Sequence, residues 1–129
     1  LFLVSYFVLQ LDPWYMPRYV IPLAGMIFAS SMNSISLAAE RLRAELRKNI
    51  SYDNTKRIAL KTALIPITNS LFAVGLVSIP GMMTGQILSG ISPLVAIRYQ
   101  IMVMCMIFSA VGMSTYFFLI MNKSKKNFS

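Results

Sequence analysis

A run of 36 residues without charge, residues 62–97, is the feature that most constrains this chain. The run is apolar, but Pro66, Pro80 and Pro93 interrupt it, and polar side chains such as Asn69 and Gln86 lie within it. Polar and helix-breaking residues inside a membrane are costly unless they face protein or a water-lined path. The run therefore favours a transport protein over a simple lipid anchor.

The composition predicts an integral membrane protein. Apolar residues make up 57% of the chain and charged residues only 12%, against roughly 25% charged residues in an ordinary soluble domain. The mean hydropathy is +0.65. In a soluble protein of 129 residues, so few charged side chains would not cover the surface of such an apolar core.

The net charge of +8 is distributed as in a membrane protein rather than a nucleic-acid-binding one. Seven of the twelve basic residues lie between Arg41 and Lys61, and three more lie in residues 123–126. Basic residues gather on the cytoplasmic flanks of membrane spans. We therefore expect a multi-pass protein of the cell inner membrane with a cytoplasmic C-terminus, in contact with lipid and with no nucleic-acid partner.

Hydropathy and turn residues divide the chain into helices. Residues 1–11 are expected to be the end of a helix, residues 12–18 a loop, and residues 19–39 a span of about 32 Å. Residues 40–48 continue as a charged helix in which Glu40, Arg41, Glu45 and Lys48 have the spacing of ion pairs. A cap at Ser51 or Asp53 then predicts a second short helix that ends at Lys61.

The uncharged run is too long for one crossing, since 36 residues of helix extend about 54 Å. The natural break is Pro80-Gly81, which predicts helices over residues 64–79 and 82–89. Ser92 caps the next helix, with Pro93 at its first position, and that helix reaches about Ile120 before a basic tail.

The expected fold class is therefore all-α, with polytopic membrane helices and one helix broken by proline and glycine. Residues 1–129 form a single membrane domain, expected to be the C-terminal part of a longer chain. Residues 40–61 are the cytoplasmic connection.

Catalytic chemistry is not expected. The chain has no histidine, only four carboxylates and no glycine loop of the nucleotide-binding type. We expect no enzyme activity and no cofactor, with any ATP hydrolysis on a separate subunit. Of the ten methionines, Met82 and Met83 adjoin the break, where core packing and binding of a soft metal are about equally good interpretations. The metal ligands, if any, are left undetermined.

Polar and conformationally special residues around the break are candidates for a transport pathway. An equally good interpretation of the polar ones is that they form hydrogen bonds between helices. The candidates are Asn69, Ser70, Ser78, Pro80, Gly81, Met82, Met83, Thr84 and Gln86.

Two segments carry a resemblance to a known family. They are residues 17–46, which read PRYVIPLAGMIFASSMNSISLAAERLRAEL, and residues 63–104, within which VGLVSIPGMMTGQILSG is the most specific run. Both are similar to the permease subunit of FetB-type iron-export ABC transporters, a family that includes the membrane subunits of plant aluminium-tolerance transporters. The resemblance covers roughly residues 12–121.

The resemblance implies an all-helical permease that exports iron, another metal or a small solute. It also implies a separate ABC ATPase subunit and a second permease copy as partners. The charged connection would then touch the ATPase, with Arg41, Arg43, Glu45 and Arg47 as docking candidates. Two alternatives stay open, namely a non-ABC membrane protein such as a secondary transporter subunit or assembly factor, and an inactive truncated permease fragment.

Overall fold

The computed structural model describes residues 2, 6, 17–48, 51–76 and 81–126, and all secondary structure in these residues is helical. Four α-helices follow one another: α1 (Pro17–Leu46), α2 (Tyr52–Leu76), α3 (Gly81–Leu88) and α4 (Pro93–Lys126). Three of them are long and apolar enough to cross a membrane, over Val20–Leu46, Tyr52–Val74 and Pro93–Asn122. The expected all-helical fold with several membrane spans is confirmed.

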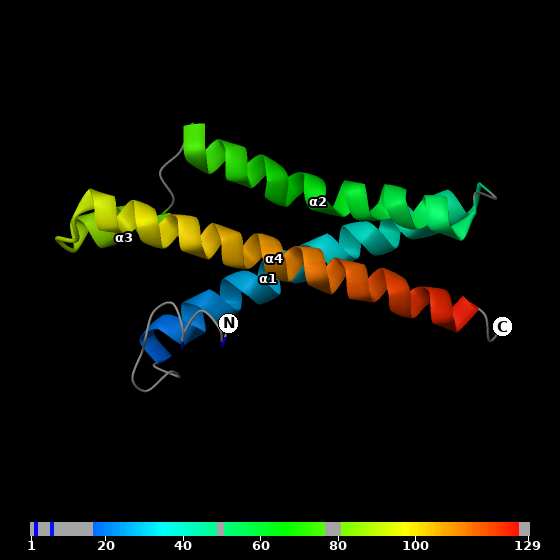
Figure 1. The fold of residues 1–129 in the computed structure, drawn as a ribbon, viewed down its shortest axis with the longest axis horizontal. Helices are drawn as coiled ribbons and strands as arrows, with labels where there is room; N and C mark the ends of the chain where they lie inside the picture. Colours follow the sequence, from blue (N-terminus) through cyan, green and yellow to red (C-terminus); the bar gives the residue numbers. More distant parts are fainter. Residues whose placement is uncertain (1, 3–5, 7–16, 49–50, 77–80, 127–129) are drawn as a thin grey trace.

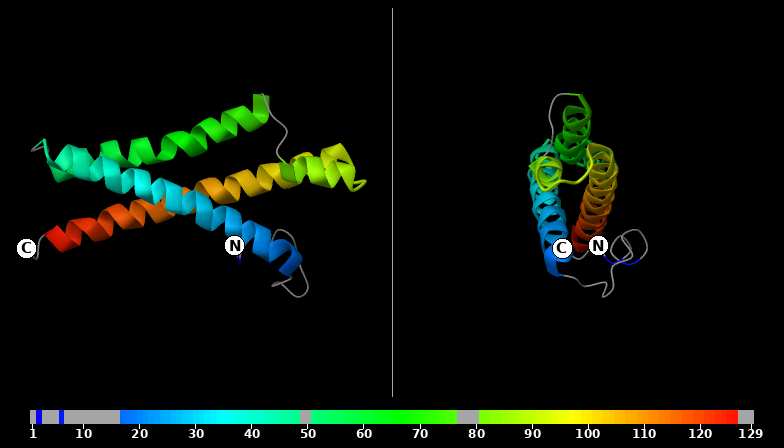
Figure 2. Two further views of the ribbon diagram at one scale, coloured as in Figure 1. Left: turned by 180° about the vertical axis from the view of Figure 1, so that it is seen from behind. Right: turned by 90° about the vertical axis from the view of Figure 1, so that its left-hand side faces the viewer.

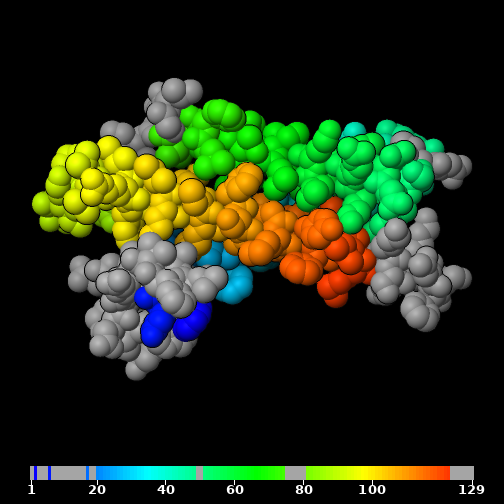
Figure 3. Space-filling model, in the orientation of Figure 1, coloured from blue at the N-terminus to red at the C-terminus, as the bar shows by residue number. Residues whose placement is uncertain are grey.

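The three long helices form an elongated bundle with two distinct ends (Figure 1). At one end α1 leads to α2 and α4 finishes. We call this the charged end, because the basic residues of α2 and those of α1 other than Arg18 lie toward it. At the other end, the α3 end, short α3 lies beside the beginning of α4, near the start of α1 (Figures 1 and 2). The space-filling view shows α3 and the start of α4 as one compact lobe (Figure 3).

Helix α4 is the central element of the bundle. Of the apolar window in α4, 39% of the residues are buried, against 11% in each of α1 and α2. α1 crosses α4 and also packs against α2 (Figure 2). Large apolar side chains remain exposed on all three helices, among them Phe28, Phe72 and Phe117. Such a surface is stable in lipid or against other membrane helices and would be unusual in water.

The core has two parts of different character. Toward the α3 end, Leu23 of α1 packs with Val103, Met106, Ile107 and Val111 of α4. Toward the charged end the buried residues are Ala38, Leu42, Ala59, Ala63 and Leu119, so that alanine occupies three of the five positions. Small side chains allow helix backbones to approach closely, and residues of all three long helices meet there.

Two hydrogen bonds between helices accompany this close contact. The Ser34 hydroxyl of α1 donates to the backbone carbonyl of Ala63 in α2 at 2.5 Å. The Tyr52 hydroxyl of α2 donates to the backbone carbonyl of Leu119 in α4 at 2.6 Å. Together they join α1 to α2 and α2 to α4.

The break between α2 and α3 follows the sequence expectation. α2 ends at Leu76 and α3 begins at Gly81, and α3 lies against α4 rather than extending α2 (Figure 1). Ser78 and Pro80 lie outside the described residues. A new helix thus begins within two residues of the Pro80-Gly81 pair, where proline removes a backbone donor.

A glycine turn joins α3 to α4. Gly90 has a φ of 87°, a conformation that glycine adopts at little cost. The Ile91 N–H donates to the Gln86 carbonyl and the Gly90 N–H to the Ile87 carbonyl, both at 3.0 Å. This pair of bonds is a Schellman motif, which satisfies carbonyls at the end of α3. α4 then starts at Pro93 directly after Ser92, as expected.

Several helix boundaries expected from the sequence are wrong. α1 begins at Pro17, inside the expected loop, because proline suits the first position of a helix. No separate short helix ends at Lys61, since α2 continues without interruption from Tyr52 into the apolar span. α4 continues to Lys126, where a tail was expected after Ile120. In the last two cases charge marks the end of the apolar pattern, whereas Lys and Arg are good helix formers.

Candidate functional site

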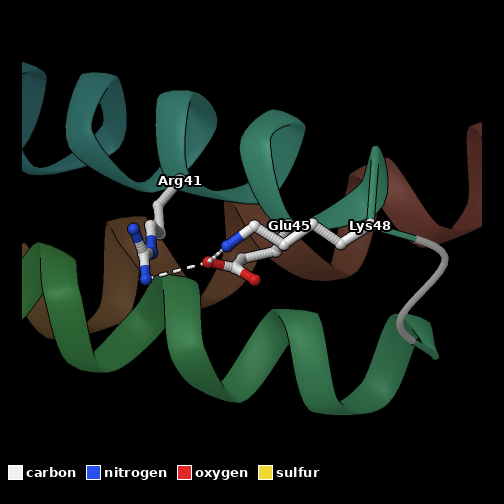
Figure 4. A network of polar contacts seen from close by, with 3 residues as sticks. All are labelled: Arg41, Glu45 and Lys48. Carbon is white, nitrogen blue, oxygen red and sulfur yellow. Dashed lines mark hydrogen bonds and ion pairs between the residues drawn. The ribbon is translucent and has the colours of Figure 1, made fainter.

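A buried carboxylate organises the charged end of α1. Glu45 is only 3% exposed and is the most buried charged residue among those described. Its Oε1 atom lies 2.8 Å from the Arg41 Nη2 atom and 3.2 Å from the Lys48 Nζ atom (Figure 4). These are the i,i+4 and i,i+3 pairs that the sequence predicted. The carboxylate of Glu45 is thus neutralised within the chain by Arg41 and Lys48.

The other two docking candidates are in a different position. Arg43 and Arg47 are exposed and make no ion pair within the described part of the chain. They line a cleft of about 540 Å³ on the outer face of α1, together with Glu40. The small residues Ser36, Ala39 and Ala44 complete the lining. The four candidates therefore divide into a structural pair, Arg41 and Glu45, and an available pair, Arg43 and Arg47.

Replacing Glu45 by glutamine is expected to destabilise the charged end by about 1 kcal/mol, because a charge-assisted bond to two cations is lost while the volume is kept. The value is small since both cations are largely exposed and screened. Chemical unfolding in detergent measures it. Glu40→Gln, at an exposed and unpaired position of the same helix, is the control and is expected to change stability by less than about 0.5 kcal/mol. Equal effects of both variants would contradict a stabilising role for Glu45.

A groove of about 150 Å³ with both polar and apolar walls, the latter including Leu37 and Ile67, lies near the middle of the candidate membrane spans. α1 contributes Ser30, Asn33 and Ser34, α2 contributes Pro66 and Ser70, and Val111 of α4 also lines it. Ser70 donates its hydroxyl hydrogen to the Pro66 carbonyl at 2.9 Å. Asn33 lies in the uncharged span of α1 and was not among the transport-pathway candidates. The structure places it on the groove that Ser70 also lines, so two amide- or hydroxyl-bearing helices meet at mid-membrane depth.

A second cavity, of about 370 Å³, lies at the α3 end. Pro22 of α1, Met82, Gly85 and Gln86 of α3, and Tyr99 of α4 contribute to its lining. Tyr99 and Val111 are twelve residues apart on α4, which corresponds to about 18 Å along the helix axis. We refer to this cavity as the outer cavity and to the groove above as the mid-membrane groove.

The transport-pathway candidates do not form one site. Met82 and Gln86 line the outer cavity, and Ser70 lines the mid-membrane groove. Asn69 is exposed on α2 beside Ser70, whereas Gly81, Met83 and Thr84 lie on α3 and are not among the described lining residues. Ser78 and Pro80 lie outside the described residues. Within the described residues, no three His, Cys, Asp or Glu side chains gather as they would around a metal ion.

Comparison with known proteins identifies the family. The model of the uncharacterised protein family UPF0014 matches residues 1–54 and 49–126. The chain belongs to the UPF0014 family. The resemblance found in the sequence is thereby confirmed. No solved structure shows a significant match to the chain.

Individual relatives of this UPF0014 chain come from bacteria and plants. It is 42% identical to UPF0014 membrane protein slr1647 of Synechocystis over 84% of this chain and 48% of that protein. It is 38% identical to the probable iron export permease protein FetB of Escherichia coli, over 78% of this chain and 45% of FetB. It is 35% identical to protein ALUMINUM SENSITIVE 3 of Arabidopsis thaliana, over 77% of this chain and 42% of the relative. The chain spans somewhat less than half the length of these relatives.

Sequence reasoning about this UPF0014 chain missed the residues that connect its helices. Ser34 and Tyr52 each donate a hydrogen bond to a neighbouring helix, and Pro22 and Tyr99 line the outer cavity. Ser34 lies within the small-residue spacing of α1, which signals a close helix contact but not the partner. Tyr52 gave no signal, because a tyrosine near a membrane boundary usually suits the interface.

Proposed function

We propose that this chain is part of the membrane-spanning permease subunit of an ABC transporter. The transporter exports iron, another metal or a small solute, and a separate subunit hydrolyses the ATP. The relationship to FetB, a probable iron export permease, supports the transport role. The observation that carries the proposal is this relationship. The mid-membrane groove adds to it, because polar side chains of α1 and α2 that gather within apolar spans can serve a path or a partner.

The proposed topology follows from the distribution of charge. With three spans, the α1–α2 connection and the end of α4 lie on the same side of the membrane. Both are rich in basic residues, so we place the charged end in the cytoplasm of a cell inner membrane. The outer cavity then lies toward the opposite surface. In this orientation the cleft with Arg43 and Arg47 is available to a soluble ATPase, and a second permease copy completes the assembly.

The proposal is tested by transport in inverted membrane vesicles that contain the full-length permease. Accumulation of radioactive iron is measured with and without the candidate ATPase subunit and with and without ATP. Uptake into inverted vesicles that needs both ATP and the ATPase is the expected result. Uptake that needs neither ATP nor the ATPase would favour a secondary transporter. A full-length permease that associates with no ATPase subunit would overturn the ABC assignment.

Replacing Ser70 by leucine is expected to reduce transport by about tenfold or more. The larger apolar side chain fills the mid-membrane groove and removes a polar group from it, and both changes oppose passage of a hydrated or polar solute. Vesicle uptake and membrane insertion are measured together. Phe72→Leu, at a position that is 66% exposed on the same helix, is the control and leaves transport near that of the unchanged protein. Normal transport by the Ser70→Leu variant would show that the mid-membrane groove is not part of the transport pathway.

A further inference from the structure

The side chain of Asn33 is an amide without a partner at mid-membrane depth. Asn33 lies in the middle of the candidate span Val20–Leu46, and Glu40, the nearest charged residue of α1, is about 10 Å away along the helix. The Asn33 side chain is exposed and forms no hydrogen bond within the described part of the chain. An amide has two donor hydrogens and an acceptor oxygen, and lipid offers a partner to neither. Asn33 therefore indicates contact with protein rather than with lipid.

Asn33 lines the mid-membrane groove, and this groove is open on one side. α1 and α2 are close together at the charged end and diverge toward the α3 end (Figures 1 and 2). α4 closes one side of the resulting fork, where Val111 is only 1% exposed. On the walls of the groove, by contrast, Asn33 of α1 and Pro66 and Ser70 of α2 are exposed. The described residues therefore leave the side opposite α4 uncovered.

A proline adds a second polar group on the α2 wall. Pro66 has no N–H, so α2 lacks the usual donor for the backbone carbonyl of Thr62, four residues earlier. The nearby hydroxyl of Ser70 is used elsewhere, since it donates to the Pro66 carbonyl at 2.9 Å. Inside a membrane, backbone groups that a proline leaves free are satisfied by neighbouring helices, side chains or water. Both walls of the groove thus carry a group that suits a hydrogen-bonding neighbour.

A second copy of this chain does not fit the open side of the groove. Two copies in one membrane have the same orientation, so a two-fold contact through the groove brings both charged ends together at the same depth. Like charges that face each other across an interface oppose association. The exposed basic residues at that end are Arg43, Arg47, Arg57 and Lys61. A second copy is therefore expected to contact another face.

The rest of the full-length protein is a better occupant. More than half of slr1647, of FetB and of ALUMINUM SENSITIVE 3 lies outside the region that matches this chain. The groove, of about 150 Å³, is too small to contain a helix, which is about 10 Å wide. A helix can lie across the mouth of the groove and insert only its side chains. Such a helix is able to reach the Asn33 amide, whereas a lipid chain would leave it unpaired.

We propose that a further membrane helix of the full-length protein, from the part that this chain does not include, covers the open side of the mid-membrane groove. This covering helix contacts Asn33 of α1 and Ser70 of α2, and one of its polar side chains forms a hydrogen bond with the Asn33 amide. The groove then becomes an enclosed space between four helices. The inference goes beyond the transport proposal, because the packing is measured without ATP, without the ATPase and without a transported solute.

Photochemical cross-linking from both walls of the groove tests the proposal in the full-length protein. The photoreactive residue p-benzoylphenylalanine replaces Asn33 in one variant and Ser70 in another, and mass spectrometry identifies the cross-linked peptides. Both reporters are expected to react with one and the same segment outside this chain. That segment belongs to the same polypeptide, so the product migrates as a monomer in a denaturing gel. The control reporter at Met32, which is exposed on α1 but does not line the groove, is not expected to label that segment.

Three cross-linking results would overturn the proposal. A covalent dimer as the main product would place a second copy over the groove. Products with lipid or detergent alone would show that the groove is open to the membrane. Reaction of the two reporters with different segments would show that no single helix covers it. If the reporter at Asn33 or Ser70 prevents folding, Leu37 and Ile67 on the same two walls carry it instead.

Asn33→Leu tests the hydrogen bond separately. The substitution is expected to lower the melting temperature of the full-length protein in detergent by about 3 °C, because a hydrogen bond to the covering helix is lost. On a surface that faces lipid, the same substitution would leave the melting temperature unchanged or raise it, since an apolar side chain suits lipid better than an amide. Either of these results would contradict the proposed bond. Met32→Leu, at the exposed neighbouring position, is the control and is expected to shift the melting temperature by less than about 1 °C.

Discussion

Replacing Ala63 by leucine is expected to separate α1 from α2 and to destabilise the bundle by about 2 kcal/mol or more. Ala63 is completely buried, and its carbonyl accepts the hydrogen bond from Ser34. Ala38 and Ala59 are also completely buried in the same cluster. Three alanines meet there, and Leu42 and Leu119 pack around them. Inserting extra methylene groups into such a contact typically costs about 1–3 kcal/mol, and loss of the Ser34 bond adds to that.

The matched control is Ala29→Leu, the same substitution at an exposed position of α1. It adds the same hydrophobic volume to the chain but meets lipid or detergent, and it is expected to change stability by less than about 0.5 kcal/mol. The free energy of unfolding of both variants is measured by denaturation in mixed micelles. If the Ala63→Leu variant has the same free energy of unfolding as the control, the close packing of α1 against α2 at the charged end is contradicted.

The parts of the fold that follow from local sequence were predictable. Hydropathy alone identifies three spans, because lipid requires about twenty apolar residues in a row. The break near Gly81 and the start of α4 at Pro93 follow from the backbone chemistry of proline and glycine. The pairing of Glu45 with Arg41 and Lys48 follows from helical spacing. The break, the start of α4 and the ion pairs each depend on residues within about two helical turns of one another, and each span depends on one continuous stretch of sequence.

Helix ends were less predictable, because two signals conflict there. The charge of Lys56, Arg57 and Lys61 ends the apolar pattern of α2, yet these residues are good helix formers and the helix continues through them. Helix termination requires a residue that stops the hydrogen-bond pattern, and Lys61 does not. The same reasoning explains why α4 extends to Lys126.

The candidate sites depended on which helix faces meet, and a single sequence does not determine this. Asn33 and Ser70 are 37 positions apart, and only the packing of α1 against α2 brings both to the mid-membrane groove. The sequence grouped Ser70 with Met82 and Gln86 because they lie in one uncharged run. The structure assigns them to separate cavities, since α3 lies against α4 and α1 while Ser70 faces α1. Closeness along the chain did not predict which residues share a cavity, because the uncharged run is divided between two helices.

Reversing the charge of Arg43 and Arg47 together is expected to abolish association with the proposed ATPase subunit. Both arginines are exposed, and neither is used in the Glu45 network. Within the described residues, the open cleft beside them is lined by one face of α1, which includes the small residues Ala39 and Ala44. A partner that recognises two arginines presents carboxylates, and placing Arg43→Glu and Arg47→Glu opposite carboxylates costs several kcal/mol. Such a penalty corresponds to a loss of affinity of about a hundredfold or more.

The control for this charge reversal is Arg57→Glu together with Lys61→Glu, at two exposed positions of α2. It changes the net charge of the charged end by the same amount, so effects on membrane orientation or on lipid headgroups are equal in both double variants. Co-purification of the ATPase is measured for each, together with correct insertion. The α1 variant is expected to lose the ATPase, while the α2 variant retains it. If both lose it, the basic residues act through topology and bulk charge. If both retain it with correct insertion, the ATPase docks elsewhere, and the cleft on α1 is not its binding site.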